Sequence, residues 1–416
     1  MEECMCRVVV TGMGVISPVG NDLDTFWDNL KKGVCGIGKI KRFDASNLKV
    51  SLDAEVKDFN PKEYYDSMQE IRKSDLFMQY AMAAAKQAVT QSRILEDGID
   101  SERFGVYIGS GIGGINSTIR EQDKLREKGP DMVSPFFVPM MISNMAAGAI
   151  SIKFGAKGPT LPVVTACATS TNTIGEAYRA IKHGYADAII TGGSEASINE
   201  LAMAGFINCQ ALNLAENPDE GSLPFDKRRG GFVMGEGAGI LILEEYKHAK
   251  ARGANILAEV IGYGNTADAY HITAPDPEGS GAIRAIKSVV KEGEIDENSE
   301  IYINAHGTGT HLNDAMETKA IKAVFGKRAY DIHVSSTKSM TGHMMGATGA
   351  VEAIASVLAL KDGIIPPTIN YKEKDEECDL DYTANKAVCA DIEYAISTSL
   401  GFGGHNACIA FKRYEA

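Results

Sequence analysis

The same local pattern occurs twice in this chain: a short β-branched strand that runs into a cluster of glycines. The first copy reads VYIGSGIGG at 106–114, and the second reads IYINAHGTGT at 301–310. In both copies, small residues that predict a turn and a helix come next, followed by a strand that ends in glycines. These segments are 163–183 and 187–193 in the first copy, and 341–361 and 395–404 in the second. Because ligand sites in such sheets favour the carboxyl ends of strands, we expect two related halves whose loops converge on one site.

Short β-branched runs alternate with helical stretches along the whole chain. Strands are predicted at 7–10, 104–108, 186–191, 239–243, 301–304 and 407–411. Strands that alternate with helices indicate an α/β protein with covered sheets. We place the two halves at 1–250 and 251–416. No Pro-rich or Ser-rich linker separates them, so we expect one rigid body rather than two mobile domains.

Composition excludes several classes of protein. With 416 residues, 44% of them hydrophobic and 23% charged, the chain can build a large core and is neither disordered nor fibrous. Its net charge of −13 has the wrong sign for non-specific electrostatic binding to nucleic acid phosphates or anionic lipid. No apolar stretch approaches the roughly 18 residues of a membrane helix, and residues 1–6 lack the features of a secretory signal. We therefore expect a cytoplasmic protein with neither a membrane nor a nucleic acid partner.

The eight cysteines are scattered along the chain, which favours neither a disulfide framework nor a metal cluster. Cys4 and Cys6 form an isolated C-x-C pair near the N-terminus. His306 and His311 have the wrong spacing for two metal ligands on one helix face. We therefore expect no metal site, and we expect most cysteines to be buried apolar side chains.

Cys167 is the strongest candidate for a nucleophile. The apolar run 161–165 predicts a buried strand that ends just before it, and the small residues 168–174 predict a helix that begins just after it. At a helix N-terminus, the macrodipole and unpaired backbone N–H groups favour a thiolate and stabilise an oxyanion. A cysteine that only packs between the strand and the helix is the alternative from this stretch alone.

Two histidines occupy comparable turns in the second half of the chain. His306 follows the predicted strand 301–304 and opens a Gly-Thr-Gly-Thr loop, and His343 lies between glycines in Thr-Gly-His-Met-Met-Gly. A lone histidine is more often a structural residue. Since Cys167 and these two histidines lie at corresponding strand-end turns of the two halves, we interpret His306 and His343 as catalytic candidates.

Two other short patterns suggest different chemistry. Ser335 and Lys338 have the S-x-x-K spacing of serine acyl-transferring enzymes, but the accompanying S-D-N and K-T-G motifs do not occur in the sequence. The glycines of 109–114 fit the dinucleotide fingerprint G-x-G-x-x-G after a strand, with Asp131 further on. The following residues, 122–129, are strongly polar and show no apolar-periodic helix, so the expected βαβ context is missing. A glycine-lined wall for an apolar chain fits these residues as well.

Taken together, the motifs resemble those of the elongating β-ketoacyl-acyl-carrier-protein synthases of the synthase II type, within the thiolase fold. The resemblance spans nearly the whole chain. It is carried by RVVVTGMGVISPVG at 7–20, GSGIGG at 109–114, SPFFVP at 134–139, VTACATS at 164–170, GGSEA at 192–196, PFDKRRGGFVMGEGAG at 224–239, DAYHITAP at 268–275, NAHGTGT at 304–310, STKSMTGHMMGATGAVEA at 336–353 and LGFGGHN at 400–406. It implies a five-layered αβαβα homodimer that extends acyl chains presented by an acyl carrier protein, without a cofactor.

The resemblance also implies roles for individual residues. The family's Cys-His-His triad falls on Cys167, His306 and His343. Lys338 would order the histidines through a network with Glu352, and Phe402 would donate a backbone N–H and gate the acyl pocket. The remaining matches are Thr273, Thr308 and Thr310 along the pantetheine arm, and Ile112, Phe137 and Phe206 on the tunnel wall, Phe137 across the dimer interface. Core packing is the alternative for the apolar ones.

The chemistry accounts for these residue types. Cysteine keeps a transferred acyl group activated as a thioester, whereas serine would form a more inert ester. When a malonyl thioester loses carbon dioxide, negative charge develops on its carbonyl oxygen and requires hydrogen-bond donors there, a task that suits His306 and His343. The resulting carbanion attacks the acyl group on Cys167 and yields a β-ketoacyl product.

The sequence departs from the family's pattern at positions around the site and its carrier-docking surface. The departures are Asp131-Met132, Asn213-Leu214-Ala215, Leu223, Gly230 and His405. Acyl carrier proteins are acidic, and their synthases use basic patches for the encounter. The basic residues that remain for docking are Arg72, Lys73, Lys124, Arg126 and Lys128. A plain solvated helix face is the alternative interpretation of these residues.

Three other functions share parts of this pattern. A type II polyketide or polyene ketosynthase would use the same chemistry to make another product. A non-condensing partner subunit that measures chain length would lack the cysteine, so Cys167 argues against it. A degradative thiolase using coenzyme A would carry a second catalytic cysteine near its C-terminus. We interpret Cys408, which lies inside an apolar strand-like stretch, as a packing residue instead.

Overall fold

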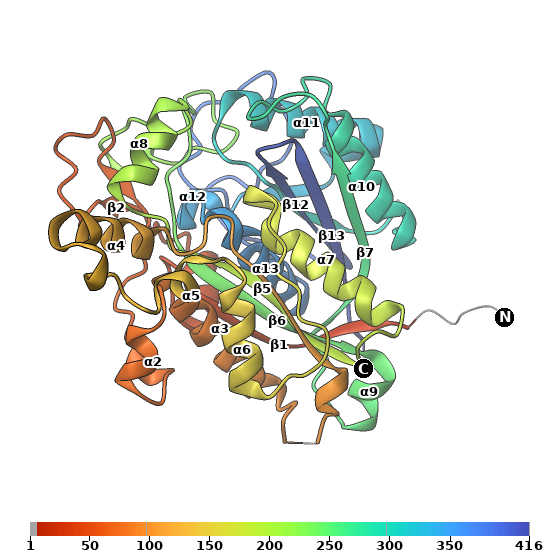
Figure 1. Ribbon diagram of the computed structural model, residues 1–416. Coiled ribbons are helices and arrows are strands. Elements are labelled where there is room, and N and C mark those ends of the chain that lie inside the picture. The colour runs from red at the N-terminus through yellow and green to blue at the C-terminus, as the bar shows by residue number, and fades with distance from the viewer. Residues whose placement is uncertain (1–5, 97, 297, 416) are drawn as a thin grey trace.

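The computed structural model describes residues 6–96, 98–296 and 298–415, so Cys4 and the rest of the N-terminal segment 1–5 lie outside the described residues. The strands of the main sheet are β1 (Val8–Ile16), β4 (Phe104–Gly109), β5 (Ala188–Glu195), β6 (Gly237–Glu245), β7 (Ala258–Ala267), β8 (Ile301–Asn304), β9 (His333–Ser335), β12 (Tyr394–Gly401) and β13 (His405–Arg413). Their order is β4-β5-β6-β1-β7-β13-β12-β8-β9 (Figure 1). Two short pairs lie outside this sheet: β2 (Gly38–Lys39) with β3 (Leu52–Asp53), and β10 (Ile364–Ile365) with β11 (Val388–Cys389). The strands predicted at 7–10, 104–108, 186–191, 239–243, 301–304 and 407–411 each fall on a strand of the main sheet.

The helices vary in length from single turns to helices of several turns at the centre of the molecule. They are α1 (Leu23–Lys32), α2 (Met68–Arg72), α3 (Leu76–Ser92), α4 (Ile115–Lys128), α5 (Phe137–Met141), α6 (Met145–Phe154), α7 (Thr169–Lys182), α8 (Glu200–Asn208), α9 (Tyr246–Ala251), α10 (Ser280–Glu292), α11 (His311–Phe325), α12 (Lys338–Thr341) and α13 (Thr348–Asp362). The 3-10 turns Ala166–Ala168 and Met345–Ala347 lead into α7 and α13. Within the described ranges, none of these helices has the length and apolar character needed to cross a lipid bilayer.

The two ends of the sheet repeat one topology. In the first half, β4 pairs in parallel with β5, which runs antiparallel to β6, and β6 runs antiparallel to β1. In the second half, β8, β12, β13 and β7 pair in the same order and with the same directions. The halves meet where residues 8–10 pair with residues 258–260. The predicted duplication is therefore confirmed in the strand topology, whereas the division at 250/251 falls within α9 and stays a prediction.

Five layers result from the way the helices cover the sheet (Figure 1). α3 and α6 pack on one face of the first half, and α10 and α11 cover the outer face of the second half. α7 and α13 lie between the halves and contact strands of both. This αβαβα arrangement, with mixed strand directions, is the thiolase-like sandwich that the sequence predicts.

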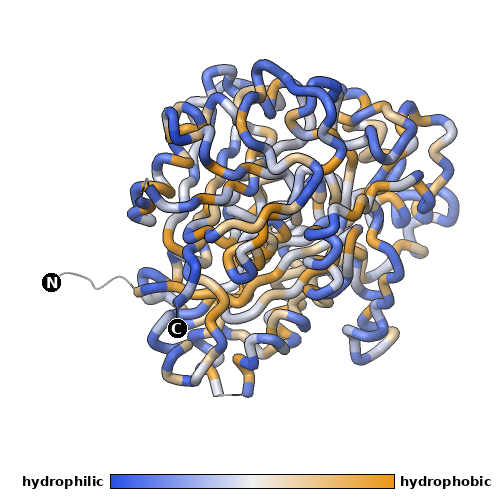
Figure 2. Tube along the Cα trace, turned by 180° about the vertical axis from the view of Figure 1, so that it is seen from behind, coloured by the Kyte–Doolittle hydropathy of each residue, from blue (hydrophilic) through white to orange (hydrophobic). Residues whose placement is uncertain are grey.

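The core surrounds the two central helices. Residues 348–360 of α13 are all buried, and nearly all of them are small or apolar, as is typical of a helix enclosed by protein on every side. Figure 2 shows the same distribution for the whole molecule, with hydrophobic residues along the central strands and hydrophilic residues on the outer loops. The turn that precedes α13 is therefore fully buried, whereas the turn that precedes α7 is half-buried.

Two local predictions are wrong. Residues 161–165 form no strand: Leu161 and Val164 are exposed, and the segment only runs beside the edge strand β4, where the backbone N–H of Leu161 donates to the carbonyl of Val106. The polar run 122–129, where no helix is expected, lies mostly within α4. That helix lacks an apolar stripe because its outer surface is solvated and its buried side chains, Ser117 and Glu121, are polar.

The approach of α7 to β7 depends on a glycine. A Cβ atom at Gly175 would lie 2.2 Å from two carbons of the Tyr263 ring, much closer than real side chains come. Tyr263 is itself buried, and its hydroxyl donates to Oδ1 of Asn172 at 2.6 Å. Any side chain at Gly175 must therefore displace the helix that follows the Ala166–Ala168 turn.

We expect Gly175→Ala to lower the melting temperature, since overpacking a well-packed core costs about 1–3 kcal/mol. Thermal unfolding followed by circular dichroism measures the effect. Gly205→Ala in α8 is the matched control, because a Cβ atom there would meet nothing within 4 Å and alanine is favoured over glycine in helices by about 1 kcal/mol. A Gly175→Ala protein that melts at the wild-type temperature would contradict this packing.

Candidate active site

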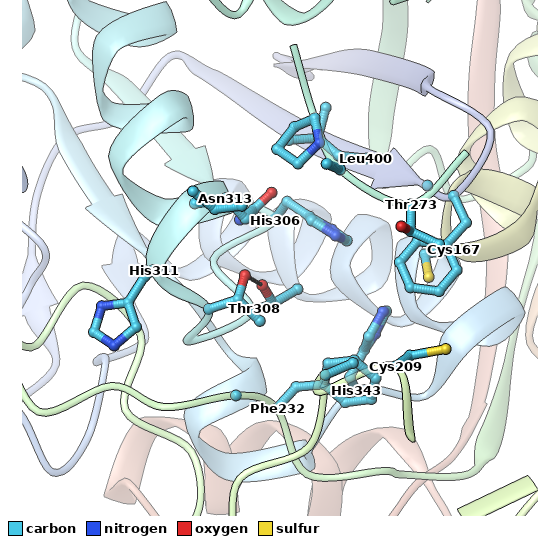
Figure 3. A pocket seen from close by; sticks show the side chains of 18 of the residues that line it. Cys167, Cys209, Phe232, Thr273, His306, Thr308, His311, Asn313, His343 and Leu400 are labelled. Atoms are coloured by element: carbon cyan, nitrogen blue, oxygen red, sulfur yellow. Dashed lines mark hydrogen bonds between the residues drawn. The ribbon is translucent and has the colours of Figure 1, made fainter. Parts of the chain in front are cut away.

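A cavity of about 340 Å³ receives side chains from both halves of the fold. Cys167 reaches it from the turn before α7, His306 from the loop after β8, and His343 from the segment between α12 and α13. Figure 3 shows the three side chains facing a common space. The reactive side chains that the sequence singles out therefore lie around one pocket.

Cys167 is the middle residue of the 3-10 turn Ala166–Ala168, directly before α7. Ala166 has φ of +51°, a left-handed conformation that residues other than glycine rarely adopt. The backbone N–H of Thr165 donates to Oγ1 of Thr169 at 2.9 Å and closes the turn against the helix. Such a conformation persists only where the surrounding structure holds it, so the position of the sulfur is set by the packing around it.

Burial sets the protonation state of Cys167. It raises the pKa of the thiol to about 12, although the charge of Lys338 and the backbone N–H groups of Phe402 and Cys167 oppose this shift. The thiol is therefore neutral at pH 7. The backbone N–H groups favour the thiolate, as the sequence predicts, but loss of solvent around the sulfur outweighs them.

The end of β12 lies against the nucleophile turn. A Cβ atom at Gly401 would lie 2.8 Å from a backbone oxygen and 3.2 Å from the backbone nitrogen of Cys167, so glycine permits this approach. The backbone N–H of the next residue, Phe402, lowers the pKa of the thiol. Two backbone N–H groups, those of Cys167 and Phe402, thus converge beside the sulfur, in the arrangement that stabilises an oxyanion.

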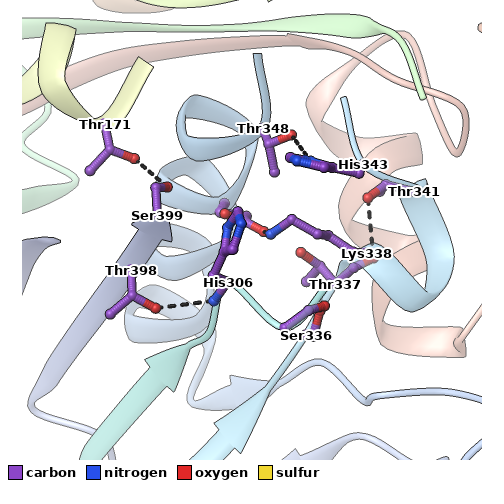
Figure 4. Close-up of polar contacts among 12 residues, drawn as sticks. Thr171, His306, Ser336, Thr337, Lys338, Thr341, His343, Thr348, Thr398 and Ser399 are labelled. Carbon is purple, nitrogen blue, oxygen red and sulfur yellow. Dashed lines mark hydrogen bonds and ion pairs between the residues drawn. The ribbon is translucent and has the colours of Figure 1, made fainter. Parts of the chain in front are cut away.

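His306 and His343 face each other across the cavity. Their ring centroids are 5.4 Å apart, and the ring planes are nearly perpendicular, at 86°. The backbone N–H of His306 donates to Oε1 of Glu317 at 2.8 Å and to Oγ1 of Thr398 at 3.0 Å (Figure 4). Nδ1 of His343 lies 3.1 Å from Oγ1 of Thr348, the first residue of α13. When this Nδ1 accepts a hydrogen bond from the Thr348 hydroxyl, Nε2 carries the hydrogen that His343 can donate.

Both histidines are held neutral. Burial lowers the pKa of His306 and of His343 well below the usual 6.5, and the charge of Lys338 lowers both further. A neutral imidazole has one N–H donor and one lone pair, so each ring can donate a hydrogen bond without bringing positive charge into the pocket. Nδ1 of His306 is buried and has no hydrogen-bond partner among the described residues.

Lys338 and Glu352 form an ion pair beside the histidines, with both side chains only 1% exposed. Burial raises the pKa of Glu352 to about 7, and Lys338 opposes this shift. Figure 4 shows the lysine side chain extending toward His306. Oγ of Ser335 lies instead 2.9 Å from the hydroxyl of Tyr302. The S-x-x-K pattern therefore does not correspond to a serine–lysine pair.

The glycine-rich loop after β4 has its backbone donors occupied. The N–H groups of Gly111 and Ile112 donate to the carboxylate of Glu195, at 2.9 and 3.3 Å. A dinucleotide phosphate would need these backbone N–H groups, at the start of the following helix, to be free to donate to it. The helix α4 is present after this loop, contrary to the prediction, but the occupied donors argue against a dinucleotide site.

The residues assigned to substrate binding divide into two groups. Those that line the cavity are Phe206, Thr273, Thr308 and Thr310. The hydroxyl oxygens of Thr308 and Thr310 lie 3.0 Å apart. Ile112 and Phe137 do not line the cavity within a single chain, and Ile112 is 38% exposed. The roles of all these residues in substrate binding stay predictions.

The basic residues assigned to carrier docking lie at the end of α2 and in the last two turns of α4. The exposed ones are Arg72, Lys73, Arg126 and Lys128. Lys124 pairs with Glu121 at 2.7 Å. Among the positions that depart from the family pattern, Leu223 is buried, while Gly230 and His405 line the cavity. Two of the departures from the family pattern therefore lie at the cavity itself.

Sequence reasoning missed several residues that hold the histidines in place. The ring of Phe232 lies edge-on to His343, with centroids 5.1 Å apart at 83°. Glu317 and Thr398 accept the backbone N–H of His306, and the Thr398 hydroxyl donates to Glu317 at 2.6 Å. Phe232 lies within a motif that carries the resemblance and could have been considered. Glu317 and Thr398 carry no local signal, because they reach the loop from distant elements.

Known proteins resemble this chain along its whole length. The family models "Beta-ketoacyl synthase, N-terminal domain" and "Beta-ketoacyl synthase, C-terminal domain" match residues 5–249 and 257–372. The 3-oxoacyl-[acyl-carrier-protein] synthase 2 of Staphylococcus aureus strain N315 is 52% identical over 410 residues, which cover 99% of each chain.

Solved structures with the same fold are ketosynthases. The ishigamide ketosynthase/chain length factor superposes with a TM-score of 0.92 at 34% identity, covering 99% of this chain and 100% of that one. A chain from the complex of a type II polyketide acyl-carrier protein with its ketosynthase, bound to a hexaketide, gives a TM-score of 0.89 at 34% identity, with the same coverage. Sequence, fold and family models agree, and the chain therefore belongs to the β-ketoacyl synthase family.

Proposed function

We propose that this chain is a 3-oxoacyl-[acyl-carrier-protein] synthase II, an acyltransferase of fatty acid elongation. It joins an acyl group held on Cys167 to malonyl-acyl carrier protein by a decarboxylative Claisen condensation and releases 3-oxoacyl-acyl carrier protein. The observation that carries this proposal is that one thiol and two neutral imidazoles line the same buried cavity. The full-length similarity to a 3-oxoacyl-[acyl-carrier-protein] synthase 2 supports it.

In the first half-reaction, Cys167 takes the acyl group from the carrier. Its sulfur attacks the thioester carbonyl, the bond to the pantetheine sulfur breaks, and the thiol proton leaves with that sulfur, so one thioester replaces another. The backbone N–H groups of Cys167 and Phe402 are the donors for the oxyanion of the tetrahedral intermediate. Because the free thiol has a pKa of about 12, it loses its proton only as the new bond forms.

In the second half-reaction, a malonyl thioester loses carbon dioxide and becomes an enolate. The N–H groups of His306 and His343 donate to the thioester oxygen, where the negative charge develops. The enolate carbon then attacks the acyl carbonyl on Cys167. A carbon–carbon bond forms, the bond to sulfur breaks, and the sulfur takes up a proton to restore the thiol. Loss of carbon dioxide and thioester exchange drive the reaction without a cofactor.

Lys338 acts on this step through the histidines. Burial lowers the pKa of both rings, and the positive charge of Lys338 lowers it further, so both rings stay neutral. Glu352 balances that charge, so the pair can remain buried. Lys338 and Glu352 are therefore positioning residues in this proposal, whereas Cys167, His306, His343 and the Phe402 backbone contact the reacting atoms.

Fatty acyl chains are the substrates we propose, rather than polyketides. The identity to the fatty acid relative is 52%, against 34% to the polyketide ketosynthases. Cys167 lines the cavity, which argues against a non-condensing partner subunit. Cys408 is fully buried in β13 and does not line that cavity, so the second cysteine of a degradative thiolase has no counterpart there.

We propose that the partners are an acyl carrier protein, as in the ketosynthase complex with its carrier, and a second copy of this chain. Exposed apolar side chains lie beside the edge strand β4 and on α6, which packs against it, and a second copy would cover them. They include Leu161, Val164 and Ile152, the last 82% exposed. We also propose that the protein acts in the cytoplasm, and that 1–250 and 251–416 move as one body.

Removing the nucleophile and removing one histidine should separate the two half-reactions. Cys167→Ala should abolish the covalent adduct formed from an acyl-carrier protein. His306→Ala should still form the adduct but release carbon dioxide from malonyl-carrier protein about 10²–10³-fold more slowly, as for loss of one donor to an oxyanion. Intact-protein mass spectrometry and carbon dioxide release measure the two effects. Condensation retained by Cys167→Ala would place the nucleophile elsewhere.

Removing the buried charge should raise the pKa of both histidines. In Lys338→Met/Glu352→Gln, the pKa of His306 and of His343 should increase, because the cation that lowers both is gone, but should stay below the usual value of about 6.5, because both rings remain buried. Titration of the imidazole ring protons by nuclear magnetic resonance measures this directly. Glu352→Gln alone is the control, since it keeps the lysine charge and should leave both pKa values low. Identical titrations in the two variants would contradict the role of Lys338.

Reversing charge on α4 should weaken binding of an acidic carrier. Arg126→Glu/Lys128→Glu should raise KM for the acyl-carrier protein about tenfold at low salt, and the difference should shrink as salt is added. Lys287→Glu is the control, because Lys287 is exposed on α10, on the opposite side of the molecule (Figure 1). Equal KM values for Arg126→Glu/Lys128→Glu and for the wild-type protein would show that the carrier docks elsewhere.

A further inference from the structure

Glu195, the last residue of β5, is fully buried and takes part in none of the steps above. Its Oε2 accepts the backbone N–H groups of Gly111 at 2.9 Å and of Gly346 at 3.1 Å. Its Oε1 accepts the backbone N–H of Ile112 at 3.3 Å and the hydroxyl of Ser110 at 3.0 Å. One carboxylate therefore ties the loop after β4 to the turn before α13.

The two tied segments are the structural duplicates of the catalytic ones. The turn Met345–Ala347 precedes α13 as the turn Ala166–Ala168 precedes α7, and both begin with a residue in the left-handed region. Gly346 therefore corresponds to Cys167. The loop after β4 likewise corresponds to the loop after β8, whose backbone N–H groups donate to Glu317. Each half thus uses a buried glutamate to hold the loop that follows its parallel strand.

Both tied segments supply side chains to an apolar cluster that packs against Cys167. Ile115 follows the loop after β4, Met345 lies in the turn before α13, and both belong to this cluster. Neither side chain lines the cavity. An acyl chain that extends from the sulfur into the cluster must therefore push these side chains apart.

The loop after β4 also lies directly on the nucleophile turn. A Cβ atom at Gly111 would lie 2.8 Å from Oε2 of Glu195 and 3.5 Å from the carbonyl oxygen of Ala166. A shift of this loop would therefore move atoms that pack beside Cys167. The hydrogen bonds to the carboxylate of Glu195 limit how far the loop can move away from that turn.

We propose that Glu195 is a positioning residue that limits the length of the acyl chain that Cys167 accepts. The inference rests on the proposed function, in which Cys167 carries that chain. Short chains fit without moving the tied segments, whereas long chains must separate them against the hydrogen bonds to the carboxylate. Weakening these hydrogen bonds favours long chains over short ones.

The substitution Glu195→Gln weakens some of the hydrogen bonds to the carboxylate and keeps the others. The amide oxygen of glutamine can still accept from Gly111 and Gly346, but the amide nitrogen cannot accept from Ile112. The hydroxyl of Ser110 can rotate and accept from that nitrogen. The variant thus loses the hydrogen bond that holds Ile112 and keeps the rest. Gly111→Ala perturbs the same carboxylate from the other side, because the new methyl group would press on its Oε2.

The experiment compares acylation of Cys167 by butanoyl, octanoyl and hexadecanoyl thioesters of pantetheine. The rate at which the adduct appears is followed by intact-protein mass spectrometry for each donor. Glu244→Gln is the matched control for loss of a buried carboxylate, since Glu244 lies in β6 and accepts from Thr11 and Arg252 away from the cavity. Melting temperatures are recorded for all proteins, so that a change in stability is separated from a change in selectivity.

The ratio of the hexadecanoyl rate to the butanoyl rate should rise about tenfold in Glu195→Gln, as expected for one lost hydrogen bond in a buried site. Gly111→Ala should shift the ratio in the same direction, and Glu244→Gln should leave it unchanged. A ratio in Glu195→Gln that stays within twofold of the wild-type ratio, with normal adducts on Cys167, would overturn the role of Glu195 alone. Absence of any adduct on Cys167 in the wild type would overturn the proposed function as well.

Discussion

The buried ion pair of Lys338 and Glu352 sets the electrostatic state of the cavity. Burial lowers the pKa of both histidines, and the lysine charge acts in the same direction, so two neutral imidazoles face each other. The thiol beside them stays neutral because burial outweighs the lysine charge there. Neutral imidazoles add no positive charge to the cavity, and their N–H donors then act on charge that develops during the reaction. The charged pair can stay buried because each partner compensates the other.

The duplicated architecture explains where the reactive groups lie and why only one site results. Equivalent strands, turns and central helices occur in both halves, and each half holds one loop with a buried glutamate. The residue types at equivalent positions of the two halves differ. For example, the second half has Gly346 where the first half has Cys167. The first half supplies the sulfur, the second supplies the imidazoles, and the remaining duplicate segments form the wall behind the nucleophile.

Local sequence patterns predicted the strands, the duplication and the three reactive side chains, because each has a short-range signature such as His343 between glycines. They could not predict the pKa of Cys167, since its burial comes from segments far along the chain. Glu195 escaped notice for the same reason, its donors being 83 to 151 residues away. Apolar residues at 161–165 were mistaken for a buried strand, because an exposed apolar face beside an edge strand has the same composition.

The central claim is that one sulfur holds the growing chain while two uncharged rings assist the loss of carbon dioxide from the second substrate. A time course on the unmodified protein, acylated first and then mixed with malonyl-carrier protein, tests this directly by following the Cys167 adduct and carbon dioxide together. The account predicts that one equivalent of carbon dioxide is released for each adduct consumed. Carbon dioxide release while the adduct persists, or an adduct on another residue, would contradict it.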